Sequence, residues 1–591
     1  MRCALHSNHP YHTMQCTPSH LLLIAGKTSG VLAGLGVLRG LWWLVDTFLL
    51  APHRDPLHAL PGPRAPSFFA SHFAQAADPD ATPRVYADWT ARFGRTLRYH
   101  GFGRHDLRLL SFDVRAVAHV LTAPAYARPW LTRAYLGRLL GRGVFSAEGA
   151  EHRAIRRLVG PAFTAQAAKD MVPIFVQKAE ELRDRWDAMM ALDAPQVLDV
   201  AHWVSRTSFD VFGLAALDYH FNALQEETEP GTIRLMCAIG HLTSESVYCA
   251  YRRMFAISDR ASRFAVLKRI YCPILETIWV SSFPFCVTPI EIMQPTRDER
   301  IMRECLHTIH SNGVALVSRK RETIKNGAAG HSKDILSLLI RADIALDASS
   351  QLSDQELVDH ITSFLFVGAD STALAITWCL HLLALHPDVQ TRLRDEITAA
   401  PPLRHNAAAD MIDSLPFLDA VVRETLRVCP PLHGTVRVAT ADDLIPISAP
   451  VELRDGTLLR AGECIRIRKG SIVHIPLEGL NMLQDIWGPD AHAFDPDRWT
   501  RLPPPARPPA FPGLANVMSF SFGPAACPGY RIAILETKAV LATLVPHFLF
   551  APVEGVEIGK FNAVSTKPFV RGQLDAGGCQ LPLNVSRYLV A

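Results

Sequence analysis

Cys527 is the residue of this chain with the clearest chemical potential, because of the loop in which it lies. The segment 520–529 reads FSFGPAACPG, and its glycine-proline pair favours a turn. Pro528 and the apolar spacing after it predict a helix over 528–544. Cys527 would then lie at the helix N-terminus, where free backbone N–H groups favour the thiolate, the form that binds metals. A buried cysteine without a ligand is the alternative.

A second reactive group lies in the middle of a long apolar stretch. A capping box begins at Ser353, and the helical pattern runs from there to Leu385, which is roughly 45 Å of helix. Halfway along it, an acid is followed by two hydroxyl residues, Asp370, Ser371 and Thr372. These side chains can hold water and pass protons. Alternatively, the Ser371 hydroxyl bonds back to its own helix and Asp370 pairs with a distant cation.

A basic pattern lies on a predicted helix within 149–163, GAEHRAIRRLVGPAF. His152 and Arg156 are four residues apart, so they share one helix face. Such a face can bind an anion, or it can be an ordinary solvated basic surface.

An acid and a base one helical turn apart occur at Glu424 and Arg427. The same ExxR pattern occurs at Glu180 and Arg183, in a helix that we expect to be exposed. The spacing alone therefore has no specificity, and only its position relative to the other motifs is informative.

The order of these motifs resembles that of the cytochrome P-450 family. The 520–529 loop is similar to the haem-binding loop FxxGxRxCxG, and 367–372 is similar to the oxygen-activation motif [AG]Gx[DE]T[TS]. The 149–163 segment resembles the WxxxR helix. Residues 424–427, followed by 494–499, resemble ExxR followed by FxPxRW.

The resemblance implies a role for each matching residue. It implies haem contacts for Cys527, His152, Arg156, Arg437, Phe520, Gly523 and Gly529, with the Cys527 thiolate as the axial ligand of the iron. It implies oxygen activation and proton delivery for Asp370, Ser371 and Thr372. It implies a buried ion network under the haem for Glu424, Arg427 and Arg498, in which each charge must be paired.

The chain departs from the family pattern at four positions. Ala525 stands where arginine or histidine is usual, and His152 replaces tryptophan while keeping an N–H donor. Val367 replaces a small residue, and Ser371 replaces threonine while keeping the alcohol. We expect Arg437 to replace part of the cationic charge missing at 525.

Composition excludes some classes of protein. The 591 residues are 49% hydrophobic and 20% charged, which is enough to bury a large core, and the net charge of +3 argues against nucleic-acid binding. The 12 cysteines form no CxxC pair, so neither a zinc site nor a disulfide framework is expected, and a reducing compartment fits best.

The sequence predicts four regions. Residues 1–20 are expected to be disordered, 21–51 to form a membrane anchor, 52–64 a proline-rich hinge, and 65–591 the haem-thiolate domain. Arg39 divides the apolar region into two halves, so a non-spanning hairpin is the alternative to a single transmembrane helix.

The resemblance implies a mainly α fold with a small β region, the cytochrome P-450 fold, and haem between the long helix and the Cys527 loop. The strands are expected at Arg95–Phe102 and Leu107–Phe112. The implied activity is a haem-thiolate monooxygenase that inserts one oxygen atom of dioxygen into a lipophilic small molecule. A terpenoid or another fungal secondary metabolite is our hypothesis for this substrate, and a fatty acid is possible.

The implied electron donor is an NADPH-cytochrome P-450 reductase, which we expect to dock on Arg153–Arg157 and residues near Lys538. The implied location is the endoplasmic reticulum membrane, with the catalytic domain in the cytosol. A haem-thiolate desaturase or rearrangement enzyme is an alternative, and a non-catalytic membrane-anchored binding protein is an alternative of another class.

Overall fold

The computed structural model describes most of the chain. The described residues are 34–65, 72, 82–101, 104–141, 143–190, 195–225, 297–326, 334–345, 351–402, 408–508, 510–562, 565–573 and 579–589. The segment 1–20, predicted to be disordered, and the first part of the predicted anchor lie outside these residues.

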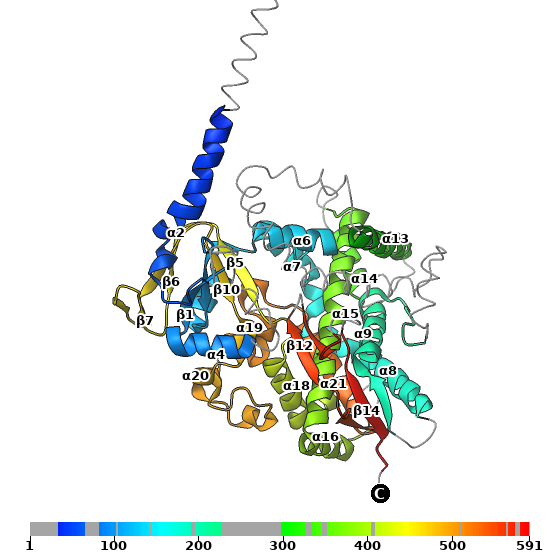
Figure 1. Cartoon of the computed structure of the whole chain (residues 1–591). Coiled ribbons are helices and arrows are strands. Elements are labelled where there is room, and N and C mark those ends of the chain that lie inside the picture. Colours follow the sequence, from blue (N-terminus) through cyan, green and yellow to red (C-terminus); the bar gives the residue numbers. More distant parts are fainter. Residues whose placement is uncertain are drawn as a thin grey trace, which may run out of the picture.

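The N-terminal part of the described chain is one apolar helix, Gly34–Arg54, which projects away from the rest of the molecule (Figure 1). Its 21 residues are long and apolar enough to cross a membrane, and its most apolar window is 0% buried. The helix passes through Arg39 without a break.

The predicted hinge is packed rather than free. Its prolines start short helical turns, α2 (Ala51–Arg54) and η2 (Pro56–Ala59). Leu57 and Leu60 are buried in the core beside the largest sheet.

Helices make up most of the remaining molecule (Figure 1). Their bounds are α4 (Thr82–Phe93), α5 (Val114–Thr122), α6 (Trp130–Leu140), α7 (Gly149–Val159), α8 (Ala165–Met189), α9 (Val200–Leu217), α13 (Arg297–Lys325), α14 (Ile335–Ile344), α15 (Asp354–Leu385), α16 (Pro387–Ala399), α17 (Ala408–Asp413), α18 (Pro416–Val428), α19 (Leu477–Asn481), α20 (Gln484–Trp487) and α21 (Tyr530–Leu544). Short 3-10 turns η3 (Gly160–Phe163), η4 (Pro496–Thr500), η7 (Met518–Phe520) and η8 (Gly523–Ala525) connect several of them.

The strands form small sheets. A five-stranded sheet has the order β1-β2-β10-β5-β3, and a three-stranded sheet has the order β11-β14-β4. The pairs β12-β13, β6-β9 and β7-β8 form hairpins or two-stranded sheets. The bounds are β1 (Thr96–His100), β2 (Leu107–Ser111), β3 (Tyr126–Ala127), β4 (Gln196–Asp199), β5 (Thr435–Ala439), β6 (Asp443–Pro446), β7 (Val451–Glu452), β8 (Leu458–Leu459), β9 (Cys464–Ile467), β10 (Ile472–Ile475), β11 (Phe548–Pro552), β12 (Ile558–Asn562), β13 (Thr566–Val570) and β14 (Pro582–Arg587).

The helix α15 runs through the centre of the helical part (Figure 1). It begins at the predicted capping box, in which the Ser353 hydroxyl accepts from the Glu356 N–H, and it ends at Leu385 as predicted. It packs against α9, α13, α18 and α21, which together bury most of its apolar surface. This placement brings α15 into contact with α21, the helix that follows Cys527.

The described residues form two main hydrophobic cores. One surrounds α15 and includes Phe175, Trp186 and Phe209, and the other lies against the five-stranded sheet and includes Tyr99 and Trp487. The predicted strand pair is confirmed, since β1 and β2 pair antiparallel with Leu97 opposite Leu110. The predicted fold class, mainly α with a small β region, is also confirmed.

Candidate active site

The Cys527 loop is held by its own backbone. The Cys527 N–H donates to the Phe520 carbonyl at 2.9 Å, and the Phe520 ring packs against Tyr530 with centroids 5.9 Å apart. Gly523 has φ 74°, and an added Cβ would lie 2.9 Å from the Leu121 carbonyl oxygen, so only glycine fits this turn. The cysteine is therefore presented by a tight and partly buried turn.

The helix after the loop starts later than the sequence predicts. Its first residue is Tyr530 and its N-cap is Gly529, so Cys527 precedes the helix instead of capping it. The predicted start at Pro528 is wrong, because the turn extends through Gly529 before the backbone becomes helical.

The protonation state of Cys527 is set by burial. Burial raises the pKa of the Cys527 thiol to about 11, although the Gly529 N–H and the charge of Arg156 act to lower it. The thiol therefore keeps its proton at neutral pH until a cation binds. A coordinated metal ion is strong enough to displace such a proton.

The helix α7 carries two basic residues of the predicted site, and Arg156 is the one that lies near this sulfur. His152 is buried, and its pKa is lowered by burial and by the nearby charges of Arg128 and Arg156. Burial also lowers the pKa of Arg156, while its proximity to Cys527 raises it. No described residue forms a hydrogen bond or an ion pair with the Arg156 guanidinium.

Two further arginines come from the β5–β3 side of the five-stranded sheet. Arg437 lies on β5 and is 7% exposed, and burial and the charge of Arg128 lower its pKa to about 10. Its guanidinium donates to the Thr435 hydroxyl and to the Val436 carbonyl, both at 2.8 Å, but to no carboxylate of the described chain. Arg128 follows β3, which pairs with β5, and forms an ion pair of 3.0 Å with Glu148.

These basic side chains form one group with excess positive charge. Arg128, Arg156 and Arg437 are opposed by Glu148, and burial makes unpaired cations costly. The group therefore fits an anionic partner with more than one carboxylate, as the haem propionates implied by the resemblance would be. Sequence reasoning missed Arg128, whose only local signal is its place directly after a short strand.

The middle of α15 carries the predicted proton-delivery residues. Asp370 and Thr372 are buried, and the Ser371 hydroxyl donates to the Val367 carbonyl at 2.5 Å. The back-bonding alternative for Ser371 is thus the observed arrangement. Asp370 pairs with no cation of the described chain, and its carboxylate accepts from the Ser565 hydroxyl at 3.1 Å.

The small residue Gly368 on α15 serves helix packing. An added Cβ would lie 2.7 Å from the Phe212 ring on α9, so glycine lets the two helices approach. The space that Gly368 leaves is thus filled by a side chain of the protein itself.

The predicted ion network is assembled around one buried carboxylate. Both side chains of the pair are 0% exposed, and Arg427 donates to the two Glu424 oxygens at 2.8 and 2.7 Å. Arg498 donates to Glu424 at 3.3 Å, Trp499 through its indole N–H at 3.1 Å, and the Asp495 N–H at 3.0 Å. The geometry joins α18 to η4 and satisfies the buried charge.

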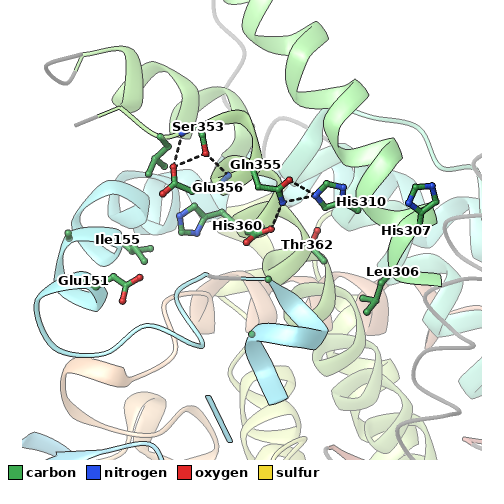
Figure 2. A pocket seen from close by; sticks show the side chains of 15 residues that line it. Glu151, Ile155, Leu306, His307, His310, Ser353, Gln355, Glu356, His360 and Thr362 are labelled. Atoms are coloured by element: carbon green, nitrogen blue, oxygen red, sulfur yellow. Dashed lines mark hydrogen bonds between the residues drawn. The ribbon is translucent and has the colours of Figure 1, made fainter. Parts of the chain in front are cut away.

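A cavity of about 1090 Å³ lies at the N-terminal end of α15, between α6, α7 and α13. Figure 2 shows that several of its polar side chains bind one another: Glu356 closes the capping box with Ser353, and the Gln355 amide oxygen lies 2.9 Å from His310 Nε2. None of the predicted site residues lines this cavity. Its nearest member on α15, Thr362, precedes Asp370 by roughly 12 Å of helix.

One part of the predicted docking face is wrong. Lys538 is 2% exposed and forms ion pairs with Asp419 at 2.6 Å and Asp413 at 3.5 Å. It is therefore bound inside the protein, between α21, α17 and α18. Arg153 and Arg157 on α7 are exposed.

Comparisons with known proteins agree on one family. A family model described as Cytochrome P450 matches residues 61–570. Cytochrome P450 monooxygenase 128 of Postia placenta is 32% identical over 94% of this chain and 97% of its own length, and cytochrome P450 monooxygenase claW of Ampulloclitocybe clavipes is 28% identical over 94% and 98%. A crystal structure of the cytochrome P450 CYP102L1 superposes with a TM-score of 0.63 over 88% of this chain and 99% of that chain at 21% identity.

Proposed function

The chain belongs to the cytochrome P450 family and is a cytochrome P450 monooxygenase, and on this premise we propose that it inserts one oxygen atom of dioxygen into a lipophilic small molecule. The observation that carries the proposal is the Cys527 turn, which presents a sulfur near Arg156, a member of a group of basic side chains with excess positive charge.

Haem would be held by residues from three parts of the chain. Cys527 would provide the thiolate ligand of the iron, and Phe520, Gly523 and Gly529 would shape the turn around it. The haem carboxylates would bind the basic group, which comprises Arg128, His152, Arg156 and Arg437. Haem with a thiolate ligand supplies the redox chemistry that activates dioxygen. The Glu424 network would have a structural role, because it fixes the segment 494–499 against α18.

Asp370, Ser371 and Thr372 would move the protons that dioxygen reduction consumes. The buried Asp370 carboxylate can accept and return a proton, and Ser371 can donate when its hydroxyl rotates away from the Val367 carbonyl. This rotation is required because the only Ser371 proton is otherwise bound to the helix.

Electrons would come from a flavin-containing NADPH-cytochrome P450 reductase. The exposed residues Arg153 and Arg157 offer positive charge on the α7 surface to an acidic partner. Lys538 takes no part, because it is buried.

The helix Gly34–Arg54 supports attachment to the endoplasmic reticulum membrane, because its length and hydropathy suit a bilayer and the protein leaves it uncovered. The other helix that passes the same test, α15, is mostly buried, so the two differ in their surroundings rather than in composition. With the fungal origin of the relatives, this favours a terpenoid or another secondary metabolite as substrate, with a fatty acid as the alternative.

A desaturase or rearrangement activity is the second candidate. It is favoured by the Ser371 hydroxyl, which is bonded to Val367 and thus is not placed for proton delivery in this structure. Turnover under isotopically labelled dioxygen separates the two, since only a monooxygenase incorporates one labelled atom into its product.

The first test is the absorption spectrum of the reduced, carbon-monoxide-treated protein. We expect the Soret band of a thiolate-ligated haem, and we expect Cys527→Ala to abolish it because no other side chain replaces the ligand. Cys464→Ala is the matched control, since Cys464 is an exposed free cysteine on β9 and should keep the band. A folded wild-type protein that lacks the band, or Cys527→Ala protein that retains it, would contradict the proposal.

A further inference from the structure

The Asp370 carboxylate has a single side-chain partner from a distant part of the sequence. Asp370 is 6% exposed, and the Ser565 hydroxyl donates to its Oδ2 at 3.1 Å. Among the described residues, no other hydrogen bond or ion pair reaches this carboxylate. A carboxylate has about four acceptor positions, so Oδ1 keeps its capacity to bind water or a proton while Oδ2 is held.

Ser565 itself has little freedom to move. It is 6% exposed and directly precedes β13, whose first residue is fixed on two sides. The Thr566 N–H donates to the Pro431 carbonyl at 2.8 Å, and the Trp378 indole N–H donates to the Thr566 carbonyl at 3.0 Å. Because Trp378 and Asp370 are both on α15, the hairpin is tied to the same helix that it contacts through Ser565.

The other strand of the hairpin is fixed as well. On β12, Lys560 forms an ion pair with the buried Glu478 of α19, and the Asn562 amide donates to the same carboxylate at 3.3 Å. The strands on both sides of Ser565 are therefore held by buried contacts, which is the support that a positioning residue needs.

We propose that Ser565 is a positioning residue for Asp370 and thereby controls proton delivery. The Ser565 hydroxyl fixes Oδ2 of the carboxylate and leaves Oδ1 to bind water or a proton, while the Ser371 proton is bound to Val367 until its hydroxyl rotates. This inference rests on the proposed function, since it concerns protons that oxygen activation consumes. It adds a residue that lies in none of the recognised sequence motifs.

The test compares two neighbouring hydroxyls of the hairpin. In Ser565→Ala we expect normal haem content, but product formed per NADPH should fall on the order of fivefold, with a matching rise in peroxide, because the carboxylate loses its orientation. The solvent deuterium isotope effect on product formation should increase. Ser565→Thr keeps the donor and should restore coupling.

Thr566→Val is the matched control. The Thr566 hydroxyl is buried and has no hydrogen-bond partner among the described residues, so its loss breaks no contact and should leave coupling unchanged. If Ser565→Ala is as well coupled as Thr566→Val, or if both variants lose coupling equally, the role of Ser565 is refuted.

A second readout needs no turnover. The thermal midpoints of wild type, Ser565→Ala, Asp370→Ala and the double variant form a thermodynamic cycle. We expect Ser565→Ala to lower the midpoint in the wild-type background and to have no effect when Asp370 is absent. Additive shifts would show that the two side chains do not interact and would overturn the inference.

The two proposals fail in different ways. If wild-type protein has no thiolate-haem band, the proposed function fails and the role of Ser565 in it fails too. If the band and labelled product are present while the cycle is additive, only the role of Ser565 is wrong.

Discussion

The ExxR pattern occurs in two helices of this molecule, and it forms a close ion pair in one of them but not in the other. On α18, Glu424 and Arg427 are fully buried and joined by two hydrogen bonds of 2.7 and 2.8 Å. On α8, Glu180 and Arg183 are partly exposed and 3.9 Å apart, and Arg183 binds its neighbour Asp184 at 2.7 Å instead. An acidic and a basic side chain one helical turn apart therefore do not always form a close ion pair with each other.

The difference comes from the surroundings of each pair. Around Glu424, water is excluded, and Arg498, Trp499 and a backbone N–H complete the set of donors. Around Glu180, water solvates both charges, so the pair gains little from contact. Burial makes the first pair a requirement of the fold, because a buried charge without its partner is costly.

The largest effect is expected when the buried pair is broken. Arg427→Ala leaves the Glu424 carboxylate in the core without its main counter-charge, and it should lower the free energy of unfolding by about 3–5 kcal/mol. We expect little soluble haem-loaded protein, measured by the haem-to-protein absorbance ratio and by thermal unfolding. A folded variant within 1 kcal/mol of wild type, on the scale of the exposed pairs, would mean that burial does not explain the comparison.

An intermediate effect should follow from removing one secondary donor. Trp499→Phe deletes the indole N–H that reaches Glu424 at 3.1 Å but keeps an aromatic ring at the same place. A hydrogen bond to a charged group contributes about 2 kcal/mol. The variant should therefore fold and bind haem, with a lower midpoint in denaturant. An unchanged midpoint would show that the Trp499 hydrogen bond to Glu424 does not contribute to the stability of the protein.

The smallest effect is expected at the exposed pair. Arg183→Ala removes the base of the second ExxR pattern, and the free energy of unfolding should change by about 0.5 kcal/mol or less. Denaturant unfolding at low and high salt measures it. A loss comparable to that of Trp499→Phe would show that exposure is a poor guide to the value of such pairs in this protein.

Much of the architecture follows from local patterns. The capping box at Ser353 and the apolar stretch to Leu385 predict α15 closely, because a long helix with a clear start and a following proline leaves little choice. The Cys527 turn is predicted less well. Its helix starts at Tyr530, and burial outweighs the Gly529 N–H and the Arg156 charge, which favour the thiolate.

The residues that sequence reasoning missed depend on contacts between distant segments. Arg128 joins the basic group only because β3 pairs with β5, where Ala127 lies opposite Val438. Ser565 reaches Asp370 because a hairpin near the C-terminal end folds back onto α15. Lys538 was predicted near a docking face, yet partners on α17 and α18 enclose it. No local pattern encodes such partners.

The apolar helices Gly34–Arg54 and α15 also have a consequence for folding during translation. The most apolar windows of Gly34–Arg54 and α15 have mean hydropathies of 1.3 and 1.4. Judged by local hydropathy alone, the two segments are therefore equally suited to insertion into a membrane during synthesis. Of the helices that cover α15, α9 and α13 are synthesised before it, but α18 and α21 emerge afterwards. During translation α15 is therefore an incompletely covered, bilayer-length segment. Docking onto α9 and α13 would cover part of this segment before α18 and α21 close around it.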